Sequence, residues 1–462
     1  MGAMNALMDA SRSALANAQT AIDVTAGNIA NQNTVGYARR VATFSTKDTV
    51  QIGNIAQGRG ANISVSAQRD RVLDQRVQYG TQSQSAADAR LSALQSVESI
   101  FTLNASGSDG AGIGDSMNGL FSSFRALQAD PTGISTRQSV LNAAQTFADA
   151  MNGASARLNG LQNSLGSQIT DSISQVNTLT AQIADLNLHI ATTSGDTSSL
   201  EDQRQSVLAS LSALVGFNQV AGDHNMISLT TSDGTSLVSG QIPHTLSVAN
   251  VSGGMHVISS GGTDVTATIS GGSIGGMLQA RNVDIPSVQN ALDQLTYSVA
   301  TAVNTDNSNG QTTAGVAGGD IFSISANANG AAGAIRVSAT NIASIAAAAT
   351  SEGTTGGSNA GAIAGLSNTS IVNGKTPSSY LAMMLTQLGG TVQNATNDST
   401  TAADSLKQAT TQRDGLSGVS LDEEAANLTQ YQRSYQAAAK IFAIVNELLA
   451  NSINLGNDVA VS

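Results

Sequence analysis

The stretch GNIANQNTVGYARR, residues 27–40, closes an apolar-striped segment with a dense group of polar residues. Asparagine tolerates the left-handed backbone conformation and glycine adopts it freely, so the chain can leave a helix here in a fixed direction. Tyr37 can anchor this exit in a groove, and Arg39 and Arg40 can reach a neighbouring carboxylate. The stretch therefore predicts that an N-terminal helix ends here at a specific turn.

Both ends of the chain carry apolar residues seven positions apart, the pattern of a coiled-coil seam. The motif SLDE, residues 420–423, predicts a capping box at the start of the C-terminal helix, with Glu423 reaching back. Two seamed helices at opposite ends of one chain are expected to pair with each other or with copies. The seam residues are Met8, Leu15, Ile22 and Ile29 at the N-terminal end, and Leu421, Leu428, Tyr431, Tyr435, Phe442, Val445 and Leu449 at the C-terminal end.

The interior predicts a mainly α fold with an inserted antiparallel β domain. Apolar residues three and four positions apart predict long helices from about residue 83 to 214, from about 286, and from about 378 to 412. Between residues 217 and 269 the period changes to two, with glycine-rich turns, and the last predicted strand contains Val265, Ala267 and Ile269. Residues 308–374 contain very few charges, and we expect loops, short strands and loose packing there.

These patterns predict three domains. The first is a terminal coiled-coil domain made of residues 1–36 and 425–462, forming an inner tube. The second is a bundle of long helices made of residues 37–215 and 276–424, which includes the low-charge segment. The third is an outer β domain made of residues 216–275.

The composition argues against several classes of function. A net charge of −12 disfavours nucleic acid and anionic membrane surfaces as partners. The chain has no cysteine, and its four histidines lack metal-ligand spacing. The motif GGSIG, residues 271–275, has the letters of a nucleophile elbow, but every histidine precedes Ser273, whereas the elbow's catalytic histidine follows its serine. We therefore expect no catalytic residue, no cofactor, no metal and no enzymatic activity.

The opening stretch resembles the N-terminal signature of the axial proteins of the bacterial flagellum, the family of rod, hook and hook-associated proteins. Tyr37 followed by Arg39 is similar to the hook-associated protein 1 branch, because hook and rod proteins more often carry Phe-Lys there. Residues 417–442 are similar to the closing motif of the family, and residues 200–217 and 272–282 match two interior segments. The signature positions matched are Asn28, Ile29, Ala30, Asn31, Asn33, Thr34, Gly36 and Tyr37.

This resemblance implies a structural protein of the hook–filament junction, outside the cell. It implies export through the flagellar type III channel without a cleavable signal peptide, and terminal segments that become ordered only on assembly. Expected partners are copies of the chain in a ring of about eleven, hook protein below, a second junction protein above, and an export chaperone on the C-terminal region. The assembly residues would be the seam residues together with Asn31, Asn33, Gly36, Tyr37 and Arg39.

Two alternatives stay open on the sequence. A hook or rod subunit shares the terminal motifs, although Gly36-Tyr37 with Arg39 and the LEDQR segment, residues 200–204, argue against it. A secreted adhesin would suit the middle of the chain, which is rich in Gly, Ser, Thr and Asn. Such an adhesin would not need matched seams at both ends. Larger family members also carry a second outer domain, and we expect only one here.

Overall fold

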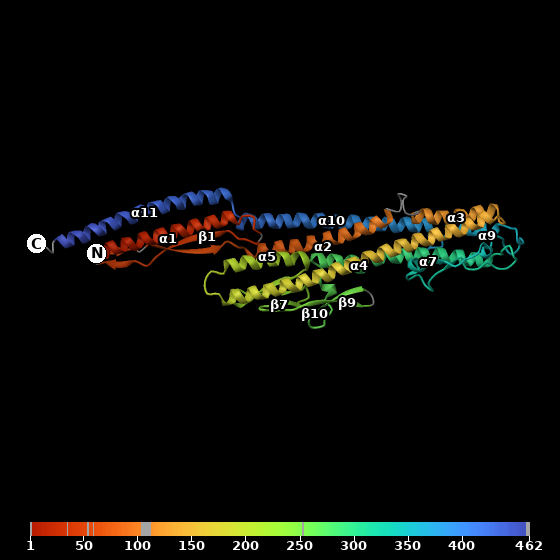
Figure 1. The fold of residues 1–462 in the computed structure, drawn as a ribbon, viewed down its shortest axis with the longest axis horizontal. Helices are drawn as coiled ribbons and strands as arrows, with labels where there is room; N and C mark the ends of the chain where they lie inside the picture. Colours follow the sequence, from red (N-terminus) through yellow and green to blue (C-terminus); the bar gives the residue numbers. More distant parts are fainter. Residues whose placement is uncertain are drawn as a thin grey trace.

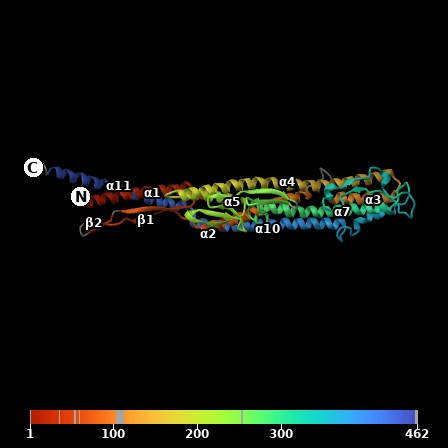
Figure 2. The same ribbon diagram turned by 90° about the horizontal axis from the view of Figure 1, so that it is seen from below.

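The computed structural model describes residues 2–34, 36–52, 55–58, 60–102, 112–251 and 254–458. The molecule is a long rod with both termini at one end, and the two perpendicular views show the same elongated outline (Figures 1 and 2). The two terminal helices occupy that end, a helical bundle forms the rest, and small sheets lie along one side of the bundle. The mainly α fold with an inserted antiparallel β region is confirmed.

The terminal helices, α1 (Gly2–Ala30) and α11 (Leu421–Asp458), pack side by side, as the seams predicted. A β ribbon that the sequence analysis did not predict lies along α1. Its strands β1 (Arg40–Thr46) and β4 (Ala61–Ala67) pair antiparallel, and β2 (Val50–Ile52) pairs with β3 (Ile55–Gln57). The Ser13 hydroxyl and the Asn17 amide both donate to the Ala61 carbonyl, at 2.8 and 2.7 Å, and thereby fasten the ribbon to α1.

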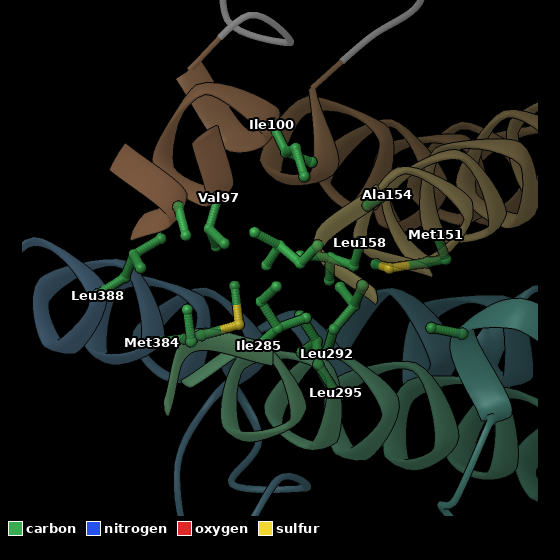
Figure 3. Packing of buried hydrophobic residues seen from close by; sticks show 14 of the residues in the cluster. Val97, Ile100, Met151, Ala154, Leu158, Ile285, Leu292, Leu295, Met384 and Leu388 are labelled. Atoms are coloured by element: carbon green, nitrogen blue, oxygen red, sulfur yellow. The ribbon is translucent and has the colours of Figure 1, made fainter. Parts of the chain in front are cut away.

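The bundle contains α2 (Arg71–Thr102), α3 (Ile113–Ala129), α4 (Ile134–Thr192), α5 (Ser198–Leu214), α7 (Ile285–Asn309) and α10 (Pro377–Ser417). Helix α4 has 59 residues and is roughly 90 Å long at 1.5 Å per residue. The core is apolar because each helix turns one stripe inward. Figure 3 shows the stripes of four helices meeting, with Val97, Leu158, Ile285 and Met384 pointing toward one another.

Helices α2 and α10 form a close pair along the bundle. Five buried residues of α10 recur every seven positions, and their side chains become smaller toward the end of the bundle next to the terminal helices. A Cβ atom added to Gly80 of α2 would lie only 3.1 Å from the Leu406 Cα, so the two backbones approach closely. The recurring residues are Leu381, Leu388, Ala395, Ala402 and Ala409.

The β region follows α5 and consists of a sheet and a separate hairpin. Strands β5 (Asn218–Ala221), β6 (Ile227–Thr230), β7 (Ser236–Ser239) and β8 (Ile242–Pro243) form an antiparallel sheet in chain order. Strands β9 (Leu246–Val251) and β10 (Gly254–Ser259) form the hairpin. Helix α6 (Gly272–Gln279) and the π-helical turn η4 (Ala280–Asp284) then return the chain to α7.

One predicted strand is wrong. Residues around Ala267 form a 3-10 turn, η3 (Thr266–Thr268), rather than a strand. The Asp264 carboxylate accepts hydrogen bonds from both the backbone and the hydroxyl of Thr266, and this side chain-to-backbone bond folds the chain locally. Val265 and Ile269 are still buried, as their apolar character requires, but they point inward from a turn.

The low-charge segment 308–374 contains the expected short elements, but the expected loose packing is wrong. Its elements are β11 (Phe322–Ser323), α8 (Ala331–Ala334), β12 (Arg336–Val337), η5 (Ile342–Ser344), α9 (Ser358–Gly365) and η6 (Leu366–Asn368). Three buried or partly buried polar residues of α7 hold this segment. Asp293 accepts from the Gly330 and Ala332 amides, Asn304 from those of Ile321 and Phe322, and Asn307 from that of Ala346. These five backbone donors thus have partners on α7, and the segment packs as core.

Candidate functional site

The residues singled out in the opening stretch gather where the terminal helices meet the bundle. We call this region the joint; it consists of residues 28–40, Arg69, Asp202 and residues 417–424. Helix α1 ends at Ala30, and the backbone then turns through bonds from Thr34 to Asn31 and from Tyr37 to Thr34. The predicted end of the helix is therefore confirmed, and the turn brings the chain onto α5.

Gly36 makes the closest approach between this turn and α5. Its φ is +85°, a conformation that favours glycine. A Cβ atom at this position would lie 2.8 Å from the Ser206 nitrogen and 2.9 Å from the Asp202 carbonyl oxygen. Both the backbone conformation and the available space therefore require glycine here.

Asn28 lies at the centre of the joint and is only 1% exposed. Its amide oxygen accepts from the Tyr37 hydroxyl at 2.8 Å and from the Arg40 backbone at 2.9 Å. Its amide nitrogen donates to the Arg40 carbonyl at 2.8 Å and to Glu424 Oε2 at 3.1 Å. One side chain thus ties the end of α1, the start of β1 and the start of α11 together.

Arg39 joins the start of β1 to the start of α11 through charge. Its Nε lies 2.8 Å from Glu424 Oε1, and its Nη1 lies 3.0 Å from Glu423 Oε2. Glu424 is 2% exposed, and a buried carboxylate of this kind needs a cation and hydrogen-bond donors. Glu423, expected to reach back in a capping box, contacts Arg39. The expectation that Arg39 and Arg40 reach a carboxylate is confirmed for both.

Arg40 and Arg69 converge on a carboxylate of α5. Asp202 Oδ2 lies 3.2 Å from Arg40 Nη2, and Asp202 Oδ1 lies 2.7 Å from Arg69 Nη2. Arg69 also donates to the Gly36 carbonyl at 2.8 Å, and the Arg40 guanidinium lies 5.6 Å from the centre of the Tyr37 ring. Burial raises the pKa of Asp202, and the two arginines act in the opposite direction. Burial likewise raises the pKa of Tyr37.

Two cavities adjoin the joint. One, of about 600 Å³, lies between α1 and α5 and is lined by Asp23, Tyr37, Arg40 and Asp202 among others. The other, of about 700 Å³, is lined by Tyr37, Arg69, Glu423 and residues 413–420. Tyr37 borders both cavities. The joint is therefore held by polar contacts beside open space, rather than by a filled apolar interface.

The structure places the remaining predicted assembly residues in different surroundings. Asn31 accepts from the Thr34 hydroxyl and donates to the Gly27 carbonyl, whereas Asn33 is exposed. Val445 is buried within the α1–α11 pair, and Leu421 and Tyr435 are exposed. The other seam residues are half-buried: Met8, Leu15, Ile22, Ile29, Leu428, Tyr431, Phe442 and Leu449. Whether these residues contact other subunits stays a prediction.

Several residues of this region were not among the predicted assembly residues. Within the joint they are Asn28, Arg69, Asp202 and Glu424. On α11, Ile441 (49% exposed), Ile444 (58%) and Leu448 (51%) form an apolar stripe on the outer surface. Their spacing of three and four places them on one helix face, and this signal was available in the sequence.

The described residues show no arrangement suited to metal chemistry. Within those ranges, no three His, Cys, Asp or Glu side chains gather as a possible metal site. No helix of the described part is long and apolar enough to span a membrane. The chemistry of the joint is recognition by charge and hydrogen bonds.

Comparison with known proteins identifies the family. Residues 94–322 match the model of the flagellar hook-associated protein FlgK helical domain. Residues 8–37 match the flagella basal body rod protein model, and residues 415–455 match the flagellar basal body rod FlgEFG protein C-terminal model. The two terminal matches contain much of the joint.

Relatives match over nearly the whole length. Flagellar hook-associated protein 1 of Bacillus subtilis is 30% identical, with 97% of each chain covered. That of Salmonella typhimurium is 23% identical, covering 98% of this chain and 100% of the relative. The structure of the flagellar hook junction protein FlgK from Burkholderia pseudomallei shares the fold, with a TM-score of 0.65, 17% identity and coverage of 74% of this chain and 100% of that one. The family resemblance expected from the sequence is confirmed, and the chain belongs to the flagellar hook-associated protein 1 family.

Proposed function

We propose that this protein is a structural subunit of the bacterial flagellum that forms the hook–filament junction on the distal end of the hook. The observation that supports this most strongly is the similarity to flagellar hook-associated protein 1 over 97% of both chains. The family consists of flagellar structural proteins rather than enzymes, in agreement with a chain whose polar cluster serves to orient helices.

The exposed stripe of α11 supports assembly with further copies. Ile441, Ile444 and Leu448 are each about half exposed or more, on a helix that already has α1 on its other side. Contiguous apolar surface of this kind marks protein–protein contact sites. Head-to-tail contacts between identical chains close into rings, and the ring proposed here has about eleven copies.

The proposed neighbours follow from this placement. Hook protein lies below the ring, a second hook-associated junction protein lies above it, and an export chaperone binds the C-terminal region before assembly. The protein leaves the cell through the flagellar export channel. The outer parts of α1 and α11, on which Leu7, Ile444 and Leu448 are exposed in the single chain, become ordered when neighbouring copies cover them.

The test is a strain lacking the gene, examined by electron microscopy with an immunoblot of the culture medium for flagellin. The expected result is hooks without filaments and flagellin lost to the medium. Missing hooks would instead place the protein in the hook or rod, the alternative that shares the terminal motifs. Normal flagella would contradict a flagellar role altogether.

A further inference from the structure

One carboxylate holds both ends of the β ribbon. Arg40 is the first residue of β1, and Arg69 follows the end of β4 by two residues. Their guanidinium groups meet at Asp202, at 3.2 and 2.7 Å. We propose that Asp202 is a positioning residue for assembly: by holding both arginines, it fixes the direction in which the terminal helix pair leaves the bundle. This inference rests on the proposed function, because only an assembling subunit needs that direction.

The surroundings of Asp202 make the contact strong. The side chains of Arg40, Arg69 and Asp202 are 25%, 16% and 13% exposed, so water screens their charges only in part. Within the described part of the chain, the buried Nε atoms of both arginines have no hydrogen-bond partner. Without the Asp202 carboxylate, Arg40 would lose the anion that it binds, and Arg69 would keep only Asp74, whose Oδ2 lies 3.6 Å from Arg69 Nη1. Leaving largely buried cations so poorly compensated is costly.

The other contacts that fix this direction include the longer ion pair between Arg69 and Asp74 of α2, at 3.6 Å. The Arg39 amide donates to the Ser417 carbonyl at 3.2 Å, and Gly36 lies against Ser206. Beside these contacts are the cavities of about 600 and 700 Å³. A packed apolar interface would hold the angle through many small contacts. Here the angle depends on a few polar contacts. Among them, the ion pairs of Asp202 hold Arg40 and Arg69, at the two ends of the ribbon.

Helix α5, which carries Asp202, is itself held firmly by its neighbours. Arg204, 7% exposed, donates to the Asn187 side chain of α4 at 2.9 Å and to the Asn225 carbonyl at 2.8 Å. The Asn225 amide donates in turn to Glu201 at 2.6 Å. A single turn of α5 thus holds the β region with Glu201 and Arg204, and the ribbon with Asp202. A positioning side chain is effective only on an element that is itself fixed.

The test measures a distance across the joint in the full chain. The protein has no cysteine, so Ala16→Cys on α1 and Ser405→Cys on α10, both exposed positions, accept spin labels specifically. Pulsed electron paramagnetic resonance then gives the distribution of distances between the labels. We expect a narrow distribution in the otherwise unchanged chain and a clearly broader or displaced one in Asp202→Asn.

The matched control is Asp284→Asn, which breaks another partly buried arginine–aspartate ion pair inside the bundle, where two nitrogens of Arg90 lie 2.8 and 3.0 Å from Asp284. This variant should leave the distribution unchanged. Asp202→Glu, which keeps the charge, should restore a narrow distribution. Arg40→Gln, which removes one of the two arginines, should give an intermediate width and remains informative if Asp202→Asn does not fold.

Two results would overturn the inference: an unchanged distribution in Asp202→Asn with normal helical content, or a broad one already in the unsubstituted chain. Neither result bears on the deletion strain, which tests the proposed function separately. In cells, Asp202→Asn at normal protein level should increase flagellin in the medium several-fold relative to Asp284→Asn. Equal amounts of flagellin from the two alleles would show that the ion pairs of Asp202 have no part in assembly.

Discussion

At the scale of single residues, the amide of Asn28 uses all four of its hydrogen-bonding positions, two donors and two acceptors. Asparagine is an unfavourable residue in a helix interior, yet here it stands in the last turn of α1 where the backbone changes direction. Asparagine is suited to this position by the partners it joins: Tyr37 and Arg40 just after the helix, and Glu424, 396 positions away.

Asn28→Ala should strongly destabilise the joint. The substitution removes the partner of the Tyr37 hydroxyl and of two backbone groups of Arg40, and it leaves the buried Glu424 carboxylate with Arg39 but without its bond at Oε2. Each unsatisfied buried group costs about 1–3 kcal/mol, and we expect a loss of about 3 kcal/mol after local relaxation. Hydrogen exchange of the amides around residues 25–40 measures the change. Asn33→Ala, the same substitution at an exposed position, should stay within about 0.5 kcal/mol.

Gly36→Ala should also destabilise the joint, for a reason of backbone conformation and space. The left-handed conformation costs an alanine about 1 kcal/mol, and the added Cβ would press on α5 backbone atoms 2.8 and 2.9 Å away. We expect the turn to leave α5 and the protection of the Ser206 amide to fall. Gly27→Ala is the control, because that helical glycine has open space around its Cβ and gains about 1 kcal/mol of helix propensity. Equal stability of the two variants would contradict this explanation.

At the scale of elements, sequence periodicity predicted the helices and strands that turn one apolar face toward the core. The long helices followed from residues three and four apart, and the β region from alternation. The ribbon of residues 40–67 could not be predicted in the same way. Only some of its residues are apolar, and its position depends on Ser13 and Asn17 of α1, whose bonds to Ala61 are tertiary contacts.

The same limit applies to the low-charge segment and to the joint. Asp293, Asn304 and Asn307 look like surface polar residues of a helix, and only the fold shows that they bind buried backbone groups. For the joint, the sequence indicated that Arg39 and Arg40 would meet a carboxylate. It could not name Asp202 or Glu424, which lie 162 and 385 positions away from the arginines they bind.

The turn after β10 predicts a pH dependence. Hydrogen bonds from Thr266, with His256 contributing, lower the pKa of Asp264 to about 2. A lowered pKa stabilises the folded state above the ordinary value of about 4, and this contribution is lost as the pH falls toward 2. We expect amide protection of β9 and β10 to fall over that range, and Asp264→Asn to remove this dependence. An NMR titration of Asp264 with a midpoint near 4 would contradict the prediction.

At the scale of the whole molecule, the rod carries its exposed apolar stripe on α11 at the end where both termini lie (Figure 1). Replacing Ile441, Ile444 and Leu448 together by glutamine should leave the stability of the single chain within about 1 kcal/mol, because exposed side chains contribute little to folding. Assembly should fail, since the surface that neighbours cover is lost. Thermal unfolding of the purified chain and the flagellin content of the medium measure the two effects.

The matched control places glutamine at three exposed apolar positions elsewhere on the rod, Ile134, Ile242 and Val283. This variant should assemble normally and retain its filaments. If both triple variants lost filaments, the effect would reflect a general loss of apolar surface. If neither did, the stripe would have no part in assembly.

The pairing of α1 with α11 also sets the order in which the chain folds. The bond between Asn28 and Glu424 spans 396 positions, and closing so long a loop from an unfolded chain is slow. Once the bundle has formed, Ser417 at the end of α10 already lies beside Arg39, and the remaining loop is short. The folded bundle thus brings the two ends of the chain close together, and α1 and α11 pair after it has formed. Until α11 reaches it, helix α1 has only the β ribbon beside it.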